Sequence, residues 1–464
     1  MTRTIQRKSG HDAMPHFSNR VPAISTPATQ NANSAVTGWR LAIFCIAAAF
    51  NAGIGASVFS GSESEEFVAP LLSYEWIYNL GGRLFLILSI ATLLWRQWDW
   101  AQLLLRAWPI LLASLIIGLT TLWSLDPQRT FLRFSHLAVT MLFIAGLVSR
   151  YGLPGLTSMF RALGWTMFLL NVLLLVEQPP FAFNQDDYAG IFRGLFVHKN
   201  VLGRFYVGVV VCVTPALLVR RPGIAHLFDV LLIALSLITI FISQSATSLV
   251  IAICAIIYIL FLWIISRIDL PHPHRIVILA IISLLSLMAM TLQLDALLVL
   301  LGRDATLTGR VALWETLWNV IQEQPWLGSG FGAFWDSDRG ADIAARIGWS
   351  PSHAHNGYIE NWLEGGAFLV ILNLASIAML LRNGITRLLR GISATSAFVS
   401  AIAITFPVYN LLEAIYIRDK SAPTMLVIAA LLISLKALRE TPAAAHLPGR
   451  AANSVARSNL SGRG

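Results

Sequence analysis

Charged side chains are scarce in this chain. Asp, Glu, Lys and Arg make up only 12% of the 464 residues, whereas hydrophobic residues make up 56%. The mean hydropathy of +0.68 is too high for a soluble domain, which could not cover so much apolar surface with polar groups. The composition therefore excludes an ordinary soluble protein, and the lipid bilayer must be the solvent for most of the chain.

Cysteine is also rare, and the basic residues are not concentrated. Cys45, Cys212 and Cys254 fall inside apolar runs without a recognisable spacing, so they are expected to be small core residues. The formal net charge is +9, but Lys and Arg are scattered over expected loops and tails. This distribution favours membrane orientation and contact with anionic lipid over binding to nucleic acid.

Long apolar runs recur between residues 39 and 438. A run of roughly 20 residues crosses about 30 Å of hydrocarbon, and a spanning segment must be helical because lipid offers its backbone no hydrogen-bond partner. The expected fold class is therefore all-α, a polytopic membrane domain of about twelve transmembrane helices. The expected spans lie near residues 40–60, 78–95, 103–123, 131–149, 160–176, 201–219, 225–242, 247–266, 275–301, 362–381, 394–414 and 422–437.

Both ends of the chain are expected to be disordered tails, residues 1–38 and 439–464, because they are polar and low in large apolar side chains. The first apolar run starts too late for a cleaved signal peptide, so it is expected to be retained. Short loops on one side carry most of the basic residues, and by the positive-inside rule that side is cytoplasmic and both termini share it. These basic residues are Arg96, Arg150, Arg220, Arg221, Arg267, Arg275, Arg382, Arg387 and Arg390.

Two polar segments on the opposite side, residues 178–200 and 302–360, are the expected catalytic loops. The first ends with Arg193, His198, Lys199 and Asn200, directly before a membrane helix. Such a cluster at the mouth of a bilayer suits an anionic headgroup such as a diphosphate. Cations that snorkel at a helix end would give the same pattern.

The second loop contains Arg310 at the start of a helical pattern. The spacing predicts a re-entrant or interfacial helix there, whose N-terminus adds partial positive charge for a phosphate. Trp314, in the same segment, is either a platform for a sugar or part of an aromatic belt at the interface. The apolar positions of this pattern are Leu313, Leu317 and Ile321.

The same loop ends with His353, Ala354, His355 and Asn356. Two histidines at the external end of a helix could be a general base with a neighbour, or half of a metal site. The sequence predicts no metal, because only Asp336, Asp338 and Glu360 are loosely available as further ligands. It also predicts no nucleotide cofactor, because the Gly-rich residues 328–332 lack the Lys and Ser or Thr of a phosphate-binding loop.

Together these motifs resemble the O-antigen ligase and polysaccharide polymerase superfamily. They are most similar to the exopolysaccharide polymerases of the succinoglycan type, and the resemblance extends from about Trp123 to Glu413. It implies a bacterial inner-membrane enzyme that uses a glycan on undecaprenyl diphosphate, without metal or nucleotide. The matching segments are Arg193-Gly194, His198-Lys199-Asn200, Thr306-Leu307-Thr308-Gly309-Arg310, His353-Ala354-His355-Asn356 and Glu364-Gly365-Gly366.

The resemblance also implies roles for single residues. We expect His355 to be the general base and Arg310 and Arg193 to bind the leaving diphosphate. We expect the other site residues to bind substrate: His198, Lys199, Asn200, His353, Asn356 and Trp314. The expected partners are the lipid-linked glycan, membrane lipid, a flippase and proteins of chain-length control and export.

Two alternatives stay open at this stage. The family's histidine motif leads to a Gly-x-x-Gly pair, but the second glycine is replaced here by Leu369. This departure favours a polymerase over a ligase that transfers glycan to lipid A core. A flippase or transporter would bury ionisable groups near the midplane of the bilayer, but the candidates in or near apolar segments lie near the ends of the expected spans. These candidates are Arg83, Arg204, Asp229 and Asp295.

Overall fold

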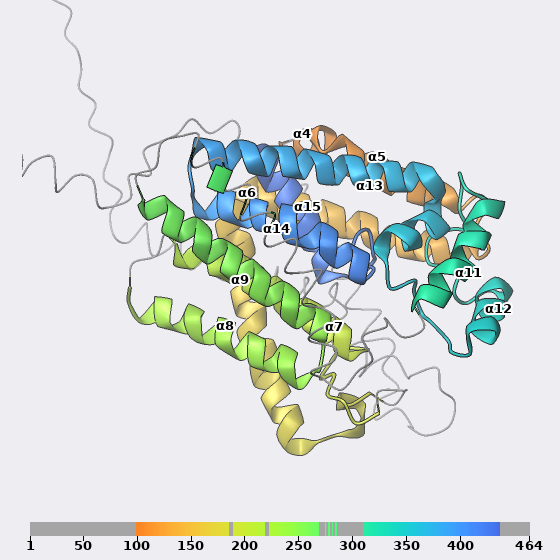
Figure 1. Ribbon diagram of the computed structural model, residues 1–464, viewed down its shortest axis with the longest axis horizontal. Helices are drawn as coiled ribbons and strands as arrows, with labels where there is room; N and C mark the ends of the chain where they lie inside the picture. The colour runs from red at the N-terminus through yellow and green to blue at the C-terminus, as the bar shows by residue number, and fades with distance from the viewer. Residues whose placement is uncertain are drawn as a thin grey trace, which may run out of the picture. The chain divides into compact units, whose positions relative to one another are not determined.

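The structure, a computed structural model, describes residues 99–184, 189–218, 222–268 and 310–436, with five single positions between 274 and 284 (Figure 1). The two expected tails, the first two expected spans and most of the span expected at 275–301 lie outside the described residues. Within the described part, every regular element is a helix.

The helices agree with an all-α polytopic membrane protein. Six of those described are long and apolar enough to cross a membrane, and the pair α4 and α5, bent by 88°, would make a seventh. The total of twelve is therefore not established, although the fold class is confirmed. The helices are α4 (Asp99–Arg106), α5 (Trp108–Thr120), α6 (Pro127–Glu177), α7 (Lys199–Leu217), α8 (Ile224–Ile242), α9 (Ala246–Arg267), α11 (Arg310–Glu323), α12 (Asp338–Ile347), α13 (Gly357–Arg390), α14 (Ala394–Leu412) and α15 (Ala422–Lys436), with one 3-10 turn at Pro180–Ala182.

Helix α6 contains two of the expected spans. Its 51 residues would extend about 77 Å as one straight helix, more than twice the hydrocarbon thickness. Gly152 interrupts the helix with φ 59° and ψ −151°, and Pro154 follows it. Since glycine tolerates this backbone and proline lacks an N–H to continue the helix, the chain can change direction here.

Helix α13 is interrupted in the same way at Gly366, where φ is 69°. A side chain at this position would collide with the backbone carbonyl of Trp326. The break separates a first limb, residues 357–365, from a longer limb that ends at Arg390. The break falls inside the span expected at 362–381, and the helix continues beyond that span to Arg390. No pattern in the sequence marked a break at Gly366.

The helices start and end on two sides of the bundle, and the chain passes from one side to the other along successive membrane-length helices. On one side, Arg387 donates to the carbonyls of Ile433 and Ser434, and Lys436 donates to those of Val148 and Ser149, close to the break in α6. These segments belong to the side for which basic loops were expected. The starts of α7, α9, α13 and α15 and the end of α14 lie on the other side, and the candidate site lies among them.

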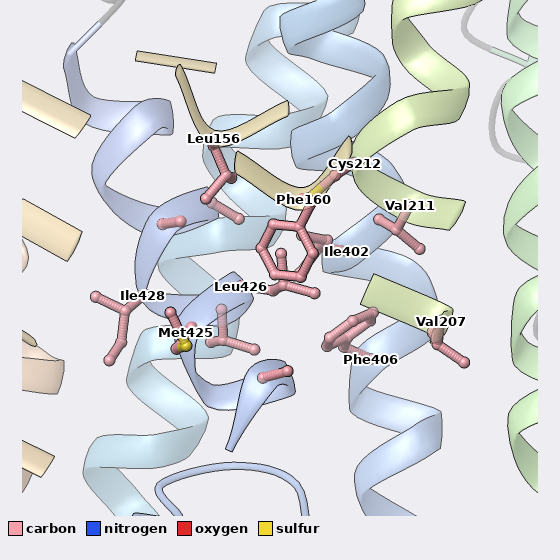
Figure 2. Close-up of a cluster of buried hydrophobic side chains, with 14 of the residues drawn as sticks. Leu156, Phe160, Val207, Val211, Cys212, Ile402, Phe406, Met425, Leu426 and Ile428 are labelled. Carbon is pink, nitrogen blue, oxygen red and sulfur yellow. The ribbon is translucent and has the colours of Figure 1, made fainter. Parts of the chain in front are cut away.

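The interior of the bundle is apolar where α6, α7, α14 and α15 meet. Helix α8 instead exposes much of its apolar surface, including Phe228 and Phe241, as a helix in contact with lipid does. Figure 2 shows the buried cluster, with labelled side chains from α6 (Leu156, Phe160), α7 (Val207, Val211, Cys212), α14 (Ile402, Phe406) and α15 (Met425, Leu426, Ile428).

One buried ion pair joins α6 to α8. Nε of Arg161 lies 2.6 Å from Oδ1 of Asp229, whose side chain has no exposed surface. Asp229 was a candidate for a transport pathway, but a partner at this distance neutralises it and gives it a structural role in joining two helices. Arg83 and Asp295, two other transport candidates, lie outside the described residues.

Candidate functional site

The carboxylate of Glu413 is the centre of a buried polar cluster. Its Oε2 lies 3.3 Å from Nε2 of His353 and 3.8 Å from Nδ1 of His355. Its Oε1 lies 3.5 Å from Nη2 of Arg310 and accepts a hydrogen bond from Nδ2 of Asn200 at 3.3 Å. Four residues from the three sequence motifs are therefore brought together around one acidic side chain that is 3% exposed.

Three of these residues lie at the ends of helices, and the two histidines lie in the loop before α13. Asn200 lies in the first turn of α7, Arg310 begins α11, and Glu413 directly follows α14. Two other expected residues are caps: Nδ1 of His198 accepts the N–H of Asn200, and Oδ1 of Asn356 accepts two N–H groups at the start of α13. Such caps satisfy N–H groups that have no partner within the helix, so they fix where α7 and α13 begin.

The backbone between the two histidines is held on both sides. The carbonyl of Ala354 accepts a hydrogen bond from Nε1 of Trp314 at 2.8 Å, and its N–H donates to Oε2 of Glu360 at 2.6 Å. His355 itself has φ 50°, a left-handed conformation that costs a non-glycine residue roughly 1–2 kcal/mol. These contacts hold the backbone of the loop, and the two imidazole rings lie with their centroids 4.0 Å apart. Trp314 acts here as an anchor for the loop.

A second charged network supports this loop from behind. Nη1 of Arg418 lies 2.6 Å from Oε1 of Glu360 and 3.2 Å from Oε1 of Glu364, which also accepts the N–H of Gly332. Burial disfavours the charged form of Arg418, but the two carboxylates outweigh it and raise the pKa of the guanidinium above its usual value. Glu360 thus links the histidine loop to the segment that follows Glu413.

The protonation states follow from the same contacts. Burial and the neighbouring His355 lower the pKa of His353 to about 4, against the opposing effect of Glu413. Burial alone would raise the pKa of the Glu413 carboxyl, but its contacts with His353 and His355 and the charge of Arg310 hold that pKa well below its usual range. At neutral pH the cluster therefore contains a neutral His353 beside an ionised Glu413.

The two remaining expected residues are Arg193, in the loop before α7, and Lys199, at the start of α7. Arg193 donates from Nε to the carbonyl of Phe181 and from Nη1 to that of Val197, bonds that hold the guanidinium within its own loop. Lys199, the first residue of α7, has only 1% of its surface exposed. Of the expected residues in this segment, Asn200 contacts Glu413, whereas Arg193 contacts backbone carbonyls of its own loop.

Sequence reasoning did not identify Glu413 or the role of Arg204. Nη1 of Arg204 donates to the carbonyl of Ala414, and its Nε donates to that of Asn200, one turn earlier on α7. The only signal for Glu413 is a single acidic residue directly after an apolar run, on the side of the catalytic loops. That signal is weak, because acidic residues at span ends are usually solvated.

The cluster can perform acid–base chemistry or hold a metal ion. His353, His355 and Glu413 offer three ligand atoms within 4.8 Å of one another. The two histidines are the pair for which the sequence left both roles open, and Glu413 supplies the carboxylate that the sequence did not provide nearby.

Comparison with known proteins gives one family match, to part of the chain. The family model for O-antigen ligase matches residues 231–374, which include the second half of α8, all of α9, α11 and α12, the loop with His353 and His355, and the first half of α13. No curated protein matches the chain. The matched residues contain Arg310, His353 and His355. The resemblance of the chain to succinoglycan-type polymerases rests on the sequence motifs alone. Within this segment the chain is similar to the O-antigen ligase family.

Proposed function

We propose that the protein polymerises oligosaccharide repeats carried on undecaprenyl diphosphate into exopolysaccharide, at the periplasmic face of the bacterial inner membrane. The observation that carries this proposal is the meeting of His355 and Arg310 at one buried carboxylate, Glu413, at the ends of membrane helices. A general base and a cation for a leaving diphosphate are the two groups that such a transfer requires. The apolar helices and the match of residues 231–374 to the O-antigen ligase family support the proposal.

In the proposed reaction, Nε2 of His355 removes the proton from an acceptor hydroxyl while Nδ1–H faces Glu413. The hydroxyl oxygen forms a bond to the anomeric carbon of the donor sugar, and the bond from that carbon to the diphosphate oxygen breaks. The proton stays on His355, the electron pair leaves with undecaprenyl diphosphate, and attack from the opposite face inverts the anomeric centre.

The electrostatics of the cluster favour this sequence of events. Glu413 stabilises the imidazolium that forms, and Arg310 faces the negative charge that grows on the diphosphate. Charges positioned beside lipid act more strongly than the same charges in water, because the local dielectric constant is low. No step of this mechanism needs a metal ion or a nucleotide.

The same site could serve a polymerase or a ligase, because both reactions need the same base and the same cation. The motif likeness and Leu369 in place of the second glycine favour the polymerase. Leu369 is fully buried, and a side chain at Gly365 would collide with it. A flippase has less support, since Asp229, a candidate for a transport pathway, is paired with Arg161.

Deletion of the gene tests the polymerase proposal. A polymerase uses the lipid-linked repeat as both donor and acceptor, so its loss should leave single repeat units on the carrier and no long chains. The measurement is the size distribution of carrier-linked glycan extracted from the deletion strain. Long carrier-linked chains together with unmodified lipid A core would identify a ligase instead.

Substitution of Arg310 by lysine should lower the turnover of purified protein roughly 10- to 100-fold, because lysine cannot reproduce a forked contact to phosphate. Arg346→Lys, on the exposed face of α12, is the matched control and should retain the rate. The rate of the wild-type protein should also survive a chelator. A strict requirement for added divalent metal would contradict the metal-independent mechanism.

A further inference from the structure

We infer that His353, His355 and Glu413 form a binding site for Zn²⁺, and that Zn²⁺ bound there inhibits the transferase. The binding part stands on the geometry of the three side chains alone. The inhibitory part rests on the proposed function, because it requires His355 to act as the general base.

The three ligand atoms already have nearly the spacing that zinc needs. In a tetrahedral site with bonds of 2.0–2.2 Å, neighbouring ligand atoms lie about 3.3–3.5 Å apart. Oε2 of Glu413 lies 3.3 Å from Nε2 of His353 and 3.8 Å from Nδ1 of His355, and all three atoms lie within 4.8 Å. Small side-chain rotations would complete three ligands and leave a fourth position for water.

An unsatisfied buried nitrogen supports the assignment. Nδ1 of His355 is buried and has no hydrogen-bond partner among the described residues. A buried polar atom without a partner is costly, and a metal ion would satisfy this one. Because the atom faces the carboxylate of Glu413, an ion between the two would contact both.

The ligands are also oriented by their neighbours, as in established zinc sites. Oε1 of Glu413 is held by Asn200 and Arg310, which turns Oε2 toward the histidines. Nδ1 of His353 lies 3.1 Å from Oγ of Ser352, and a proton shared there leaves the lone pair of Nε2 for the metal. The positive charge of Arg310 opposes a cation, so the affinity should fall below that of a structural zinc site.

Catalysis and zinc binding use opposite tautomers of His355. A neutral imidazole has one nitrogen with a lone pair and one with a proton. As a base, His355 keeps its proton on Nδ1 and its lone pair on Nε2. When zinc occupies Nδ1, the proton moves to Nε2, and the ring can no longer accept a proton from the acceptor hydroxyl. Zinc also occupies the carboxylate oxygen that would stabilise the imidazolium.

Direct binding tests the site without reference to activity. The full-length protein, purified in detergent without a polyhistidine tag, is dialysed against ZnCl₂, and its zinc content and affinity are measured. We expect one zinc per chain, and we expect His353→Ala and Glu413→Gln each to weaken the affinity by at least about tenfold. The matched control replaces both His272 and His274, the other His-x-His pair of the chain, and should leave the zinc bound.

Absence of saturable zinc, or zinc that persists in both His353→Ala and Glu413→Gln, would overturn the site and leave the proposed function untouched.

The second measurement is polymerisation by the purified protein as ZnCl₂ increases. Zinc should abolish the activity, and a chelator should restore it. His353→Ala, measured against its own rate without zinc, should need about tenfold more zinc for half-inhibition than the wild-type protein does. Bound zinc without inhibition would overturn the inhibitory role, and zinc-dependent stimulation would overturn the metal-independent function instead.

Discussion

Replacement of His355 by alanine should abolish polymer formation, with turnover lowered by about 10²- to 10⁴-fold, the usual effect of removing a general base. The expectation rests on the position of the imidazole, whose Nδ1 faces Glu413 and whose backbone is held at φ 50°. Turnover is measured with purified protein and lipid-linked repeat units. In cells the variant should reach the membrane at normal levels.

His353 is the matched control for this experiment. Its Nε2 lies closer to Glu413 than Nδ1 of His355 does, at 3.3 Å against 3.8 Å, so geometry alone does not rank the two imidazoles. We expect His353→Ala to be milder, because the motif resemblance assigns the base to the histidine that directly precedes Asn356. Normal polymer from His355→Ala, or a larger loss in His353→Ala, would contradict the assignment.

The membrane helices were predictable because their physical cause is local. A run of apolar residues of sufficient length must form a helix in lipid, and α7, α8, α9 and α14 begin and end close to the expected residues. Helix α11 was found from the spacing of Leu313, Leu317 and Ile321, all of which are buried. Helix α12 was missed, because it is a short helix inside a polar loop and has no long apolar run.

The candidate site was only partly predictable, because its centre depends on contacts between distant segments. The histidines and Arg310 stand out as polar motifs, but Glu413 contacts Asn200 across 213 positions of sequence. No local pattern encodes such a contact. For the same reason the sequence left two roles open for Trp314, whereas the structure gives it a third, as an anchor that hydrogen-bonds the carbonyl of Ala354.

Substitution of Glu413 by glutamine should reduce turnover by about 10²- to 10⁴-fold, the range expected when the carboxylate partner of a catalytic histidine loses its charge. The amide has the shape of the carboxylate, so the variant tests charge more than packing. It can no longer stabilise the imidazolium of His355, and it would leave the guanidinium of Arg310 without its buried counter-charge.

The two effects can be separated by a second variant and a second measurement. Glu413→Asp keeps the charge but shortens the side chain, so it should recover part of the rate that Glu413→Gln loses. Thermal unfolding of each purified variant reports whether the bundle is intact. If Glu413→Gln folds normally and turns over at nearly the wild-type rate, Glu413 does not assist His355, and the buried carboxylate serves only to join α7, α11 and the histidine loop at the end of α14.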